Sequence, residues 1–476
     1  MAKILLIVPG SRTFYGEPRY PVCGLSMIGA VLLNAGLQVR ALDMRLSKIS
    51  EQHLIEVFLE FKPDYVGFTI TNWDVMEAAR LAKLLKEKSS NVSVIFGGPQ
   101  ASLCPRETAS LEPVDYVVYG EGDITINELL KALDGNEPLE KVKGLVFRND
   151  QGEILITEPR PMVANLSELP WPAYELFGLS QYSSFGEKRL GIYSTRGCAF
   201  RCTFCTSKFV AGRKVRSREP DDVIKEMEYW NRHAGINHFC FLEDNLLGKH
   251  DHGRRFLEML NSSPRPFTYS LDSGVRADAL TPEICSLLVK TGCTAIAIGI
   301  ESVDPEVLKL CRKGETIEQI SKGIRLAKAA GLFVKGYFIV GLPGDTAEKV
   351  KKAVQYAKDE EIDVPRFALA QAFPRTDMEA WVKDNGTFFY DSYDYILSNT
   401  DEFHNDVHFE LPGFSKKEIW KTFKWAHGQA EKISFDRALI RRFGKRLGSV
   451  LEILNLKLVR VLIVWLYQKR LVSLPK

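Results

Sequence analysis

Two features that would place the protein in a membrane or on a nucleic acid are missing from the sequence. It contains no apolar run of about 18 residues, the length that a membrane-spanning helix requires. The formal net charge is only +3 for 476 residues, so there is no basic excess to indicate a nucleic-acid partner. The N-terminal stretch MAKILLIVPG reaches Pro9 and Gly10 too early for the core of a signal peptide. We therefore predict a cytoplasmic protein that binds no nucleic acid.

The sequence also lacks the cysteine pattern of a disulfide framework. It has nine cysteines, an odd number, and no secretory signal, which argues against paired disulfides. Five of them stand alone in apolar or mixed surroundings, where small buried thiols are common: Cys104, Cys240, Cys285, Cys293 and Cys311. Three others fall within eight residues at the spacing C-x3-C-x2-C: Cys198, Cys202 and Cys205.

Residues 1–143 alternate between short apolar runs and amphipathic segments. The run 2–9 stops at Pro-Gly, as buried strands do, whereas 75–88 has apolar residues at helical spacing and a basic last turn. Strands that alternate with helices of this length predict a parallel, doubly wound (Rossmann-like) sheet. We expect a linker at 144–187, with a hairpin near Asn149 and two prolines that resist regular structure.

A second alternation begins near Leu190 and predicts six further strands with helices between them. A complete eightfold barrel usually needs about 250 residues, and the segment 188–376 is shorter. We therefore expect an open, partial (β/α)6 barrel. The alternation stops after it, and residues 377–476 are predicted to form a mostly helical region. The fold class is α/β.

Three closely spaced cysteines do not fit a structural zinc site, which takes four ligands, usually as two separated pairs. No second pair follows in the sequence. A [4Fe–4S] cluster held by three cysteines leaves one iron without a protein ligand, and that iron is open to a substrate or cofactor with oxygen and nitrogen donors. The triplet also follows a predicted barrel strand, where barrel loops gather catalytic groups. The pattern therefore favours a cluster on Cys198, Cys202 and Cys205.

The stretch RGCAFRCTFC (196–205) resembles the signature of the radical S-adenosylmethionine (SAM) enzymes. The resemblance implies that the open iron binds the amino and carboxylate groups of SAM. It also implies that one electron from the cluster cleaves SAM to methionine and a 5′-deoxyadenosyl radical. Phe204 matches the aromatic position that lies near the adenine in this family.

Four later segments resemble the motifs of the same family at successive strand ends. They are FLEDN (241–245), GVRAD (274–278), GIES (299–302) and GYFIVGLPGDT (336–346). The resemblance implies candidates for the SAM amino group, a carboxylate partner, the ribose hydroxyls and the adenine side, in that order: Glu243 and Asp244; Arg276; Glu301; and Gly341. A fifth segment, AFPRTD (372–377), departs from the family because Arg375 replaces its usual glycine, which puts the role of the last strand in doubt.

The first domain resembles the cobalamin-binding domain that is fused to one large branch of these enzymes. The likeness lies in KPDYVGFT (62–69), VIFGGPQAS (94–102) and VDYVVYGEGD (114–123). A doubly wound sheet binds ligands beyond the carboxyl ends of its strands, and a glycine pair lets a large flat ligand approach the backbone. The candidates for cobalamin binding are Asp43, Thr69, Thr71, Trp73, Gly97, Gly98 and Glu121.

The histidine that would ligate cobalt is absent from this domain. The pattern D-x-H-x-x-G is expected after the second strand, but the sequence there reads DMRLSK (43–48), and none of the eight histidines lies in it. Many members of this branch lack it too, so the resemblance implies a cobalt without a histidine ligand from this loop. The same absence would follow if the domain had lost cobalamin and were retained for packing, so both interpretations stay open.

The segment LKLVRVLIVWLYQKR (456–470) has an apolar centre and basic flanks. The centre is too short to span a bilayer, but a helix with a basic face can lie on an anionic membrane surface. The segment could equally cap the barrel with its arginines in solvent. Membrane contact would imply a peripheral membrane location and would favour a hydrophobic or lipid-like substrate.

These resemblances imply a cobalamin-dependent radical SAM methyltransferase that acts on an unactivated carbon of a small molecule, with flavodoxin or ferredoxin as electron donor. No catalytic residue is assigned. One alternative keeps both cofactors but forms, rearranges or oxidises a ring without methyl transfer. Another is a lipid-active radical SAM enzyme with a non-functional cobalamin domain, and a third is a non-catalytic iron–sulfur sensor.

Overall fold

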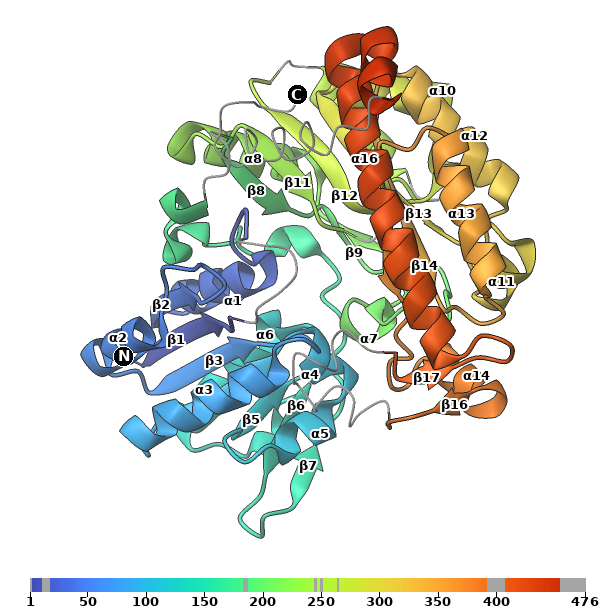
Figure 1. The fold of residues 1–476 in the computed structure, drawn as a ribbon. Helices are drawn as coiled ribbons and strands as arrows, with labels where there is room; N and C mark the ends of the chain where they lie inside the picture. Colours follow the sequence, from blue (N-terminus) through green and yellow to red (C-terminus); the bar gives the residue numbers. More distant parts are fainter. Residues whose placement is uncertain are drawn as a thin grey trace.

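The computed structural model contains two mainly parallel sheets, each with helices packed on it, and a long helix that crosses the second sheet (Figure 1). It describes residues 2–10, 18–182, 187–243, 246–248, 251–262, 265–391 and 407–453, with side chains as far as residue 442. The α/β fold class predicted from the sequence is confirmed.

The first sheet has the strand order β2-β1-β3-β4-β5-β6-β7, and β1 to β5 run parallel. Helices α1 and α6 pack on one face of this sheet and α2 and α3 on the other, so a central strand such as β1 is apolar and buried from Ile4 to Val8. The strands are β1 (Lys3–Val8), β2 (Gln38–Asp43), β3 (Tyr65–Thr69), β4 (Ser93–Gly97), β5 (Tyr116–Val118), β6 (Leu145–Arg148) and β7 (Ile154–Ile156). The helices are α1 (Cys23–Asn34), α2 (Glu51–Phe61), α3 (Val75–Lys88), α4 (Pro99–Leu103), α5 (Pro105–Ser110) and α6 (Gly122–Gly135).

This sheet continues past residue 143, the expected end of the first domain. The hairpin predicted near Asn149 is formed by β6 and β7, and β6 pairs antiparallel with β5. The rest of the expected linker holds short 3-10 helices (Leu166–Glu168, Tyr174–Phe177 and Leu179–Tyr182). The Tyr174 hydroxyl donates to the Gly191 carbonyl oxygen (2.6 Å), which ties this segment to the barrel.

The second sheet has six parallel strands in the order β8-β11-β12-β13-β14-β15. Several helices between them begin at a threonine whose side chain accepts a backbone N–H: Thr281, Thr316 and Thr346. The predicted open six-unit barrel is confirmed. The strands are β8 (Arg189–Ile192), β11 (His238–Phe241), β12 (Thr268–Val275), β13 (Cys293–Glu301), β14 (Phe333–Val340) and β15 (Val364–Leu369). The helices are α8 (Pro220–Ala234), α9 (His252–Asn261), α10 (Pro282–Lys290), α11 (Pro305–Leu310), α12 (Ile317–Ala329) and α13 (Ala347–Asp359).

The C-terminal region begins with α14 (Asp377–Asn385) and a small antiparallel pair, β16 (Thr387–Phe388) and β17 (Phe409–Glu410). Helix α16 (Lys416–Ile453) then runs along β15 and beside α13, as the long red helix in Figure 1 shows. It covers the edge of the open barrel. The basic segment 456–470 lies outside the described residues. Among the helices that are described, none is long and apolar enough to cross a membrane.

Asp363 joins the end of the barrel to α16. Its carboxylate is buried and accepts the Val334 N–H (2.9 Å) and Nε of Arg441 (3.0 Å), with Arg437 Nη2 at 3.8 Å. One buried carboxylate, directly before β15, therefore binds both strand β14 and two arginines of α16.

We expect D363N to lower the free energy of unfolding by about 1–3 kcal/mol, because it leaves buried donors without a charged acceptor. Chemical denaturation followed by circular dichroism measures this loss. D359N is the control, since Asp359 is exposed on α13 and accepts from Gln355 of the same helix. Equal stability losses in the two variants would contradict the assignment.

Candidate functional site

The three predicted cluster ligands lie in one loop, residues 197–215, called here the cysteine loop. The short strands β9 (Thr195–Arg196) and β10 (Arg216–Ser217) pair antiparallel and close the loop at its base. Gly197 has φ +96°, and a Cβ there would lie 2.4 Å from the Lys214 carbonyl oxygen, so the turn requires glycine. The Cys198 N–H donates to the Gly212 carbonyl oxygen (3.1 Å), and α7 (Ser207–Val210) follows the last cysteine.

Cys198, Cys202 and Cys205 are partly exposed, whereas the other six cysteines are buried. Cluster ligands must face a space that the cluster can enter, so this distribution fits the predicted donor set. Within the described ranges, no three His, Cys, Asp or Glu side chains converge as they would around a single metal ion. A cluster does not require such convergence, because each thiolate binds a different iron.

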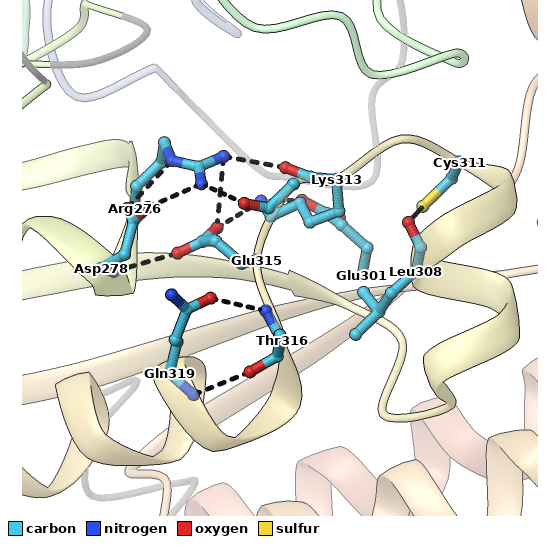
Figure 2. Close-up of polar contacts among 10 residues, drawn as sticks. Arg276, Asp278, Glu301, Leu308, Cys311, Lys313, Glu315, Thr316 and Gln319 are labelled. Atoms are coloured by element: carbon cyan, nitrogen blue, oxygen red, sulfur yellow. Dashed lines mark hydrogen bonds and ion pairs between the residues drawn. The ribbon is translucent and has the colours of Figure 1, made fainter.

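A network of buried charges lies beside the cysteine loop (Figure 2). Lys313 Nζ lies 3.1 Å from Glu301 Oε1 and 3.6 Å from Glu315 Oε2, and Arg276 Nη1 lies 3.6 Å from Glu315 Oε2. Arg276 also donates to the carbonyl oxygens of Lys313 (2.8 Å) and Gly314 (2.9 Å). Two cations and two carboxylates thus compensate one another in a site with little access to water.

These charges act on Cys202. Burial raises the pKa of the Cys202 thiol, and the nearby charges of Lys313 and Arg276 oppose that rise. Burial also works against the charge on Lys313, but the carboxylates of Glu301 and Glu315 outweigh it and raise the lysine pKa. The two cations therefore offset only part of the effect of burial, and the pKa of the Cys202 thiol stays above its ordinary value.

Glu301 enters this network through a strained backbone. It has φ +64°, a left-handed conformation that costs a residue with a Cβ roughly 1–2 kcal/mol. The β13–β14 register also shifts between Gly299 and Glu301. A Cβ on Gly299 would lie 2.6 Å from Glu301 Oε1 and 3.0 Å from Lys313 Nζ. The glycine of the GIES segment therefore makes room for the carboxylate, and strain of this kind is common at functional sites.

Arg276 makes all of its described contacts with other groups of the protein. Its guanidinium lies 3.7 Å from the centroid of the Phe200 ring, in the cysteine loop. Its Nε and Nη2 bind the two carboxylate oxygens of Asp278 at 3.0 and 2.9 Å. These contacts and the two carbonyl acceptors fix the guanidinium, which packs on Phe200 of the cysteine loop. The predicted contact of Arg276 with a SAM carboxylate stays a prediction.

Glu243 lies just after β11 and is buried, while its neighbour Asp244 falls outside the described residues. The Ser194 hydroxyl donates to Glu243 Oε1 (2.7 Å), and His252 Nε2 lies 3.1 Å from the same hydroxyl. Glu243 Oε2 has no hydrogen-bond partner among the described residues, and burial raises the pKa of Glu243 to about 7. A buried oxygen without a partner is a suitable acceptor for an ammonium group.

The two residues predicted near the adenine lie at different depths. Gly341 follows β14 with φ +91°, and its N–H donates to Asp345 Oδ2 (2.9 Å). Phe204 is half-buried and packs against the barrel core. Neither arrangement tests a contact with SAM, so both assignments stay predictions.

Three cobalamin candidates meet at the carboxyl edge of the first sheet. Thr69 ends β3 opposite Gly97, which ends β4. Gly98 has φ +100°, and a Cβ there would lie 2.8 Å from Thr69 Oγ1 and 3.0 Å from the Ile70 backbone. The strand order reverses at β1, and doubly wound sheets bind ligands at such a point. The structure thus places the glycine pair and Thr69 along the edge where a ligand is expected.

Asp43 and Thr71 are engaged inside the first domain. Asp43 accepts from Arg45 Nε (2.8 Å) and Nη2 (2.6 Å) and from the Tyr182 hydroxyl (2.9 Å). Arg45 occupies the position of the histidine in the pattern D-x-H-x-x-G. Thr71 Oγ1 accepts the Trp73 N–H (3.2 Å), and Trp73 itself is 37% exposed. Trp73 therefore offers a large ring at the same edge.

Glu121 points toward the barrel, and both of its carboxylate oxygens have partners. Arg196 Nη1 lies 3.2 Å from Oε1, while Arg216 Nη1 and the Val163 N–H each lie 2.8 Å from Oε2. Its predicted contact with cobalamin therefore competes with an ion pair between the two domains.

Sequence reasoning missed Lys313 and Glu315. They belong to the segment CRKGET (311–316), which follows α11 and resembles an ordinary charged turn in sequence. The signal that could have found them is the charge pair around Gly314. Their burial, at 7% and 5% exposed, appears only in the folded chain.

The fold and the site define an α/β protein with a Rossmann-like domain and an open barrel that carries a loop with three partly exposed cysteines. A model of the Radical SAM superfamily matches residues 192–357, and a model of the B12 binding domain matches residues 16–130. The chain is 30% identical over 380 residues to an uncharacterized methyltransferase of Pyrococcus horikoshii, covering 79% of this chain and 82% of the relative. It therefore belongs to the radical SAM enzymes with a B12-binding domain, a family that includes methyltransferases.

Other relatives carry different activities in their names. The chain is 27% identical to cytidylyl-2-hydroxyethylphosphonate methyltransferase of Streptomyces wedmorensis, over 75% of this chain and 77% of the relative. It is 28% identical to the anaerobic magnesium-protoporphyrin IX monomethyl ester cyclase of Synechocystis, over 68% and 66%. The fold is similar to that of TsrM from Kitasatospora setae with cobalamin and a [4Fe–4S] cluster bound (TM-score 0.69, 21% identity, 81% of this chain and 78% of that one). The cofactors predicted from the sequence, SAM, a [4Fe–4S] cluster and cobalamin, are confirmed, and the enzyme assignment excludes the non-catalytic sensor.

We expect G299A to weaken SAM binding roughly tenfold, equivalent to about 1.4 kcal/mol, because the added methyl displaces Glu301 from Lys313. Calorimetric titration of SAM into the reconstituted enzyme measures the change. G428A is the control, since nothing lies within 4 Å of a Cβ there. An unchanged SAM affinity in G299A would refute a role for this carboxylate.

We expect E243Q to change how stability depends on pH. The pKa of Glu243 is about 7 in the folded chain against an ordinary value of 4.5. The folded state therefore holds this proton more tightly, and its stabilising effect is complete below pH 4.5 and is lost as pH rises through 7. The free energy of unfolding of E243Q minus that of wild type is the quantity to compare. We expect this difference to be roughly 3 kcal/mol more positive at pH 8 than at pH 4.5. Urea unfolding at both pH values tests this, and a difference that does not vary with pH would contradict it.

Proposed function

We propose that the protein transfers a methyl group to an unactivated carbon of a small molecule, using SAM, a [4Fe–4S] cluster and cobalamin. The observation that carries this proposal is the cysteine loop. Its three thiols are the partly exposed ones, and the loop contacts both the barrel network and the first domain. A site held between a SAM barrel and a cobalamin domain suits a reaction that uses both cofactors.

The residues of the chain divide the work of holding these cofactors. Cys198, Cys202 and Cys205 would bind the cluster, and Thr69, Gly97 and Gly98 would form part of the cobalamin edge. Glu243, Glu301, Gly341 and Phe204 would hold SAM. When bound, the cofactors supply one-electron chemistry and a transferable methyl group.

The polar groups of the barrel would orient SAM. Glu243 Oε2 is an acceptor without a partner in the described chain, and Glu301 is held by Lys313 at 3.1 Å. Because Lys313 is itself buried, the carboxylate of Glu301 is fixed in a site with little water, where polar contacts are stronger and side reactions with solvent are fewer.

A second candidate keeps the same site but changes the outcome. The likeness to a magnesium-protoporphyrin ester cyclase favours a ring-forming reaction without methyl transfer.

In either case we propose a small reducing protein such as flavodoxin or ferredoxin as electron donor. A hydrophobic substrate and membrane contact through residues 456–470 are further proposals, and liposome binding before and after removal of residues 447–476 tests them.

We expect C202A to lose cluster iron and SAM cleavage after anaerobic reconstitution, both to near background, because the cluster then lacks a ligand. C311A is the matched control: Cys311 is buried beside the same loop, where its carbonyl oxygen accepts the Thr203 N–H (3.0 Å). Iron content and 5′-deoxyadenosine release are measured in both. Wild-type iron content in C202A would overturn the cluster assignment.

SAM with a labelled methyl group then separates the two outcomes. The enzyme is incubated with a reductant, cobalamin and small-molecule extracts of the host cell, and products are examined by mass spectrometry. A labelled methyl group in a new product supports the methyltransferase. A new product without the label supports the cyclase-like reaction.

A further inference from the structure

The cysteine loop contacts the first domain at its base. Arg196 and Arg216 stand opposite each other in the β9–β10 ladder, and each binds one carboxylate oxygen of Glu121 (3.2 and 2.8 Å). Arg196 also binds both oxygens of Asp123, at 2.7 and 3.1 Å. The two strand residues that close the loop are therefore both tied to the start of α6 in the other domain.

This base is buried. Glu121 is 8% exposed, Asp123 5% and Arg216 7%. Arg216 also donates to the carbonyl oxygens of Val163 and Ala211, both at 2.8 Å, and Ala211 directly follows α7. Buried charges of this kind add little stability over apolar residues, but removing one partner is strongly unfavourable. The pairing therefore specifies one arrangement of the loop on the first domain.

A second contact lies beyond the last cysteine, where α7 and α4 are neighbours (Figure 1). Arg375 Nη1 donates to the Leu103 carbonyl oxygen (2.8 Å) at the end of α4. Its guanidinium lies 4.5 Å from the centroid of the Phe209 ring in α7. Arg375 also has φ +65°, a conformation that suits glycine better. The arginine thus keeps an unfavourable backbone while its side chain joins both domains.

We propose that Glu121 and Arg375 are positioning residues that hold the cysteine loop in one place against the carboxyl edge of the first sheet. The proposal rests on the proposed function for the identity of the two cofactors. Interfaces between domains of one chain move by default unless they are large and apolar, and reacting groups must be placed to within about an ångström. Glu121 then acts as an anchor between the domains, and its oxygens are not available to cobalamin.

E121Q tests the buried anchor, with D363N as its matched control, since Asp363 is also a buried carboxylate shared by two arginines. Hydrogen exchange is followed at the Cys198 and Ala211 amides, which donate to Gly212 and Ser207. We expect exchange at these amides to rise about tenfold more in E121Q than in D363N, which lowers the global stability alone. Equal rises in the two variants would mean a global loss of stability and would overturn the proposal.

R375G tests the second contact, and relief of the unfavourable φ offsets part of the stability lost with the side chain. K62G is the control, because Lys62 has φ +51° at the end of α2. We expect thermal stability to be kept in both variants and exchange in α7 and α4 to rise about tenfold in R375G alone. R375K, which keeps a donor for the Leu103 carbonyl oxygen, should restore part of the protection. Wild-type exchange in R375G would overturn the role of Arg375.

A spectroscopic measurement then reports on placement itself. In enzyme reconstituted with both cofactors, the relaxation of the cob(II)alamin electron spin by the reduced cluster depends on their separation. We expect a broader distribution of relaxation rates in E121Q and R375G than in D363N and K62G, and identical distributions would refute positioning. If wild-type protein binds neither cofactor, the proposed function fails, whereas the exchange experiments still decide whether the two residues anchor the loop.

Discussion

Much of this molecule depends on the buried pairing of Glu121 and Asp123 with Arg196 and Arg216. Parallel sheets present their loops at one edge, and here two such edges belong to different domains. The ion pairs bring the base of the cysteine loop to the first domain. Because these charges are buried, each needs its partner. The ion pairs therefore fix how the edge of the barrel sheet lies against the edge of the first sheet.

The cysteine loop is also supported from the barrel side. Arg276 lies over Phe200, and Lys313 lies between two carboxylates close to Cys202. Positive φ values at Glu301 and Arg375 mark two places beside the site where a side chain with a defined contact is kept despite backbone strain. The barrel thus combines a regular sheet with local irregularity at its strand ends, where the contacts to cofactors are expected.

Periodicity was sufficient to predict most strands and helices. The amphipathic segment 75–88 is α3 residue for residue, and the second alternation, which begins near Leu190, forms the six expected barrel strands, because apolar runs between turn residues are local signals. The expected domain boundary at 143 left out β6, which pairs with β5. Helix α6 separates these two strands in the sequence, so no local pattern predicts their pairing. In sequence, the Arg375 departure put the role of the last strand in doubt, while the structure shows a contact between domains.

The sequence by itself determined the fold class and the two cofactor domains, and it predicts the cluster ligands, because spacing along the chain carries that information. The tertiary structure decided which charged residues are buried together. Lys313 and Glu315 lie 12 or more residues from Glu301 and more than 35 from Arg276 along the chain, so no local pattern could join them. Glu121 was assigned to a ligand from its position after a strand, but its carboxylate meets two arginines some 75 and 95 residues away. Burial and pairing over such distances arise only when the chain folds, within the barrel for Lys313 and between the two domains for Glu121.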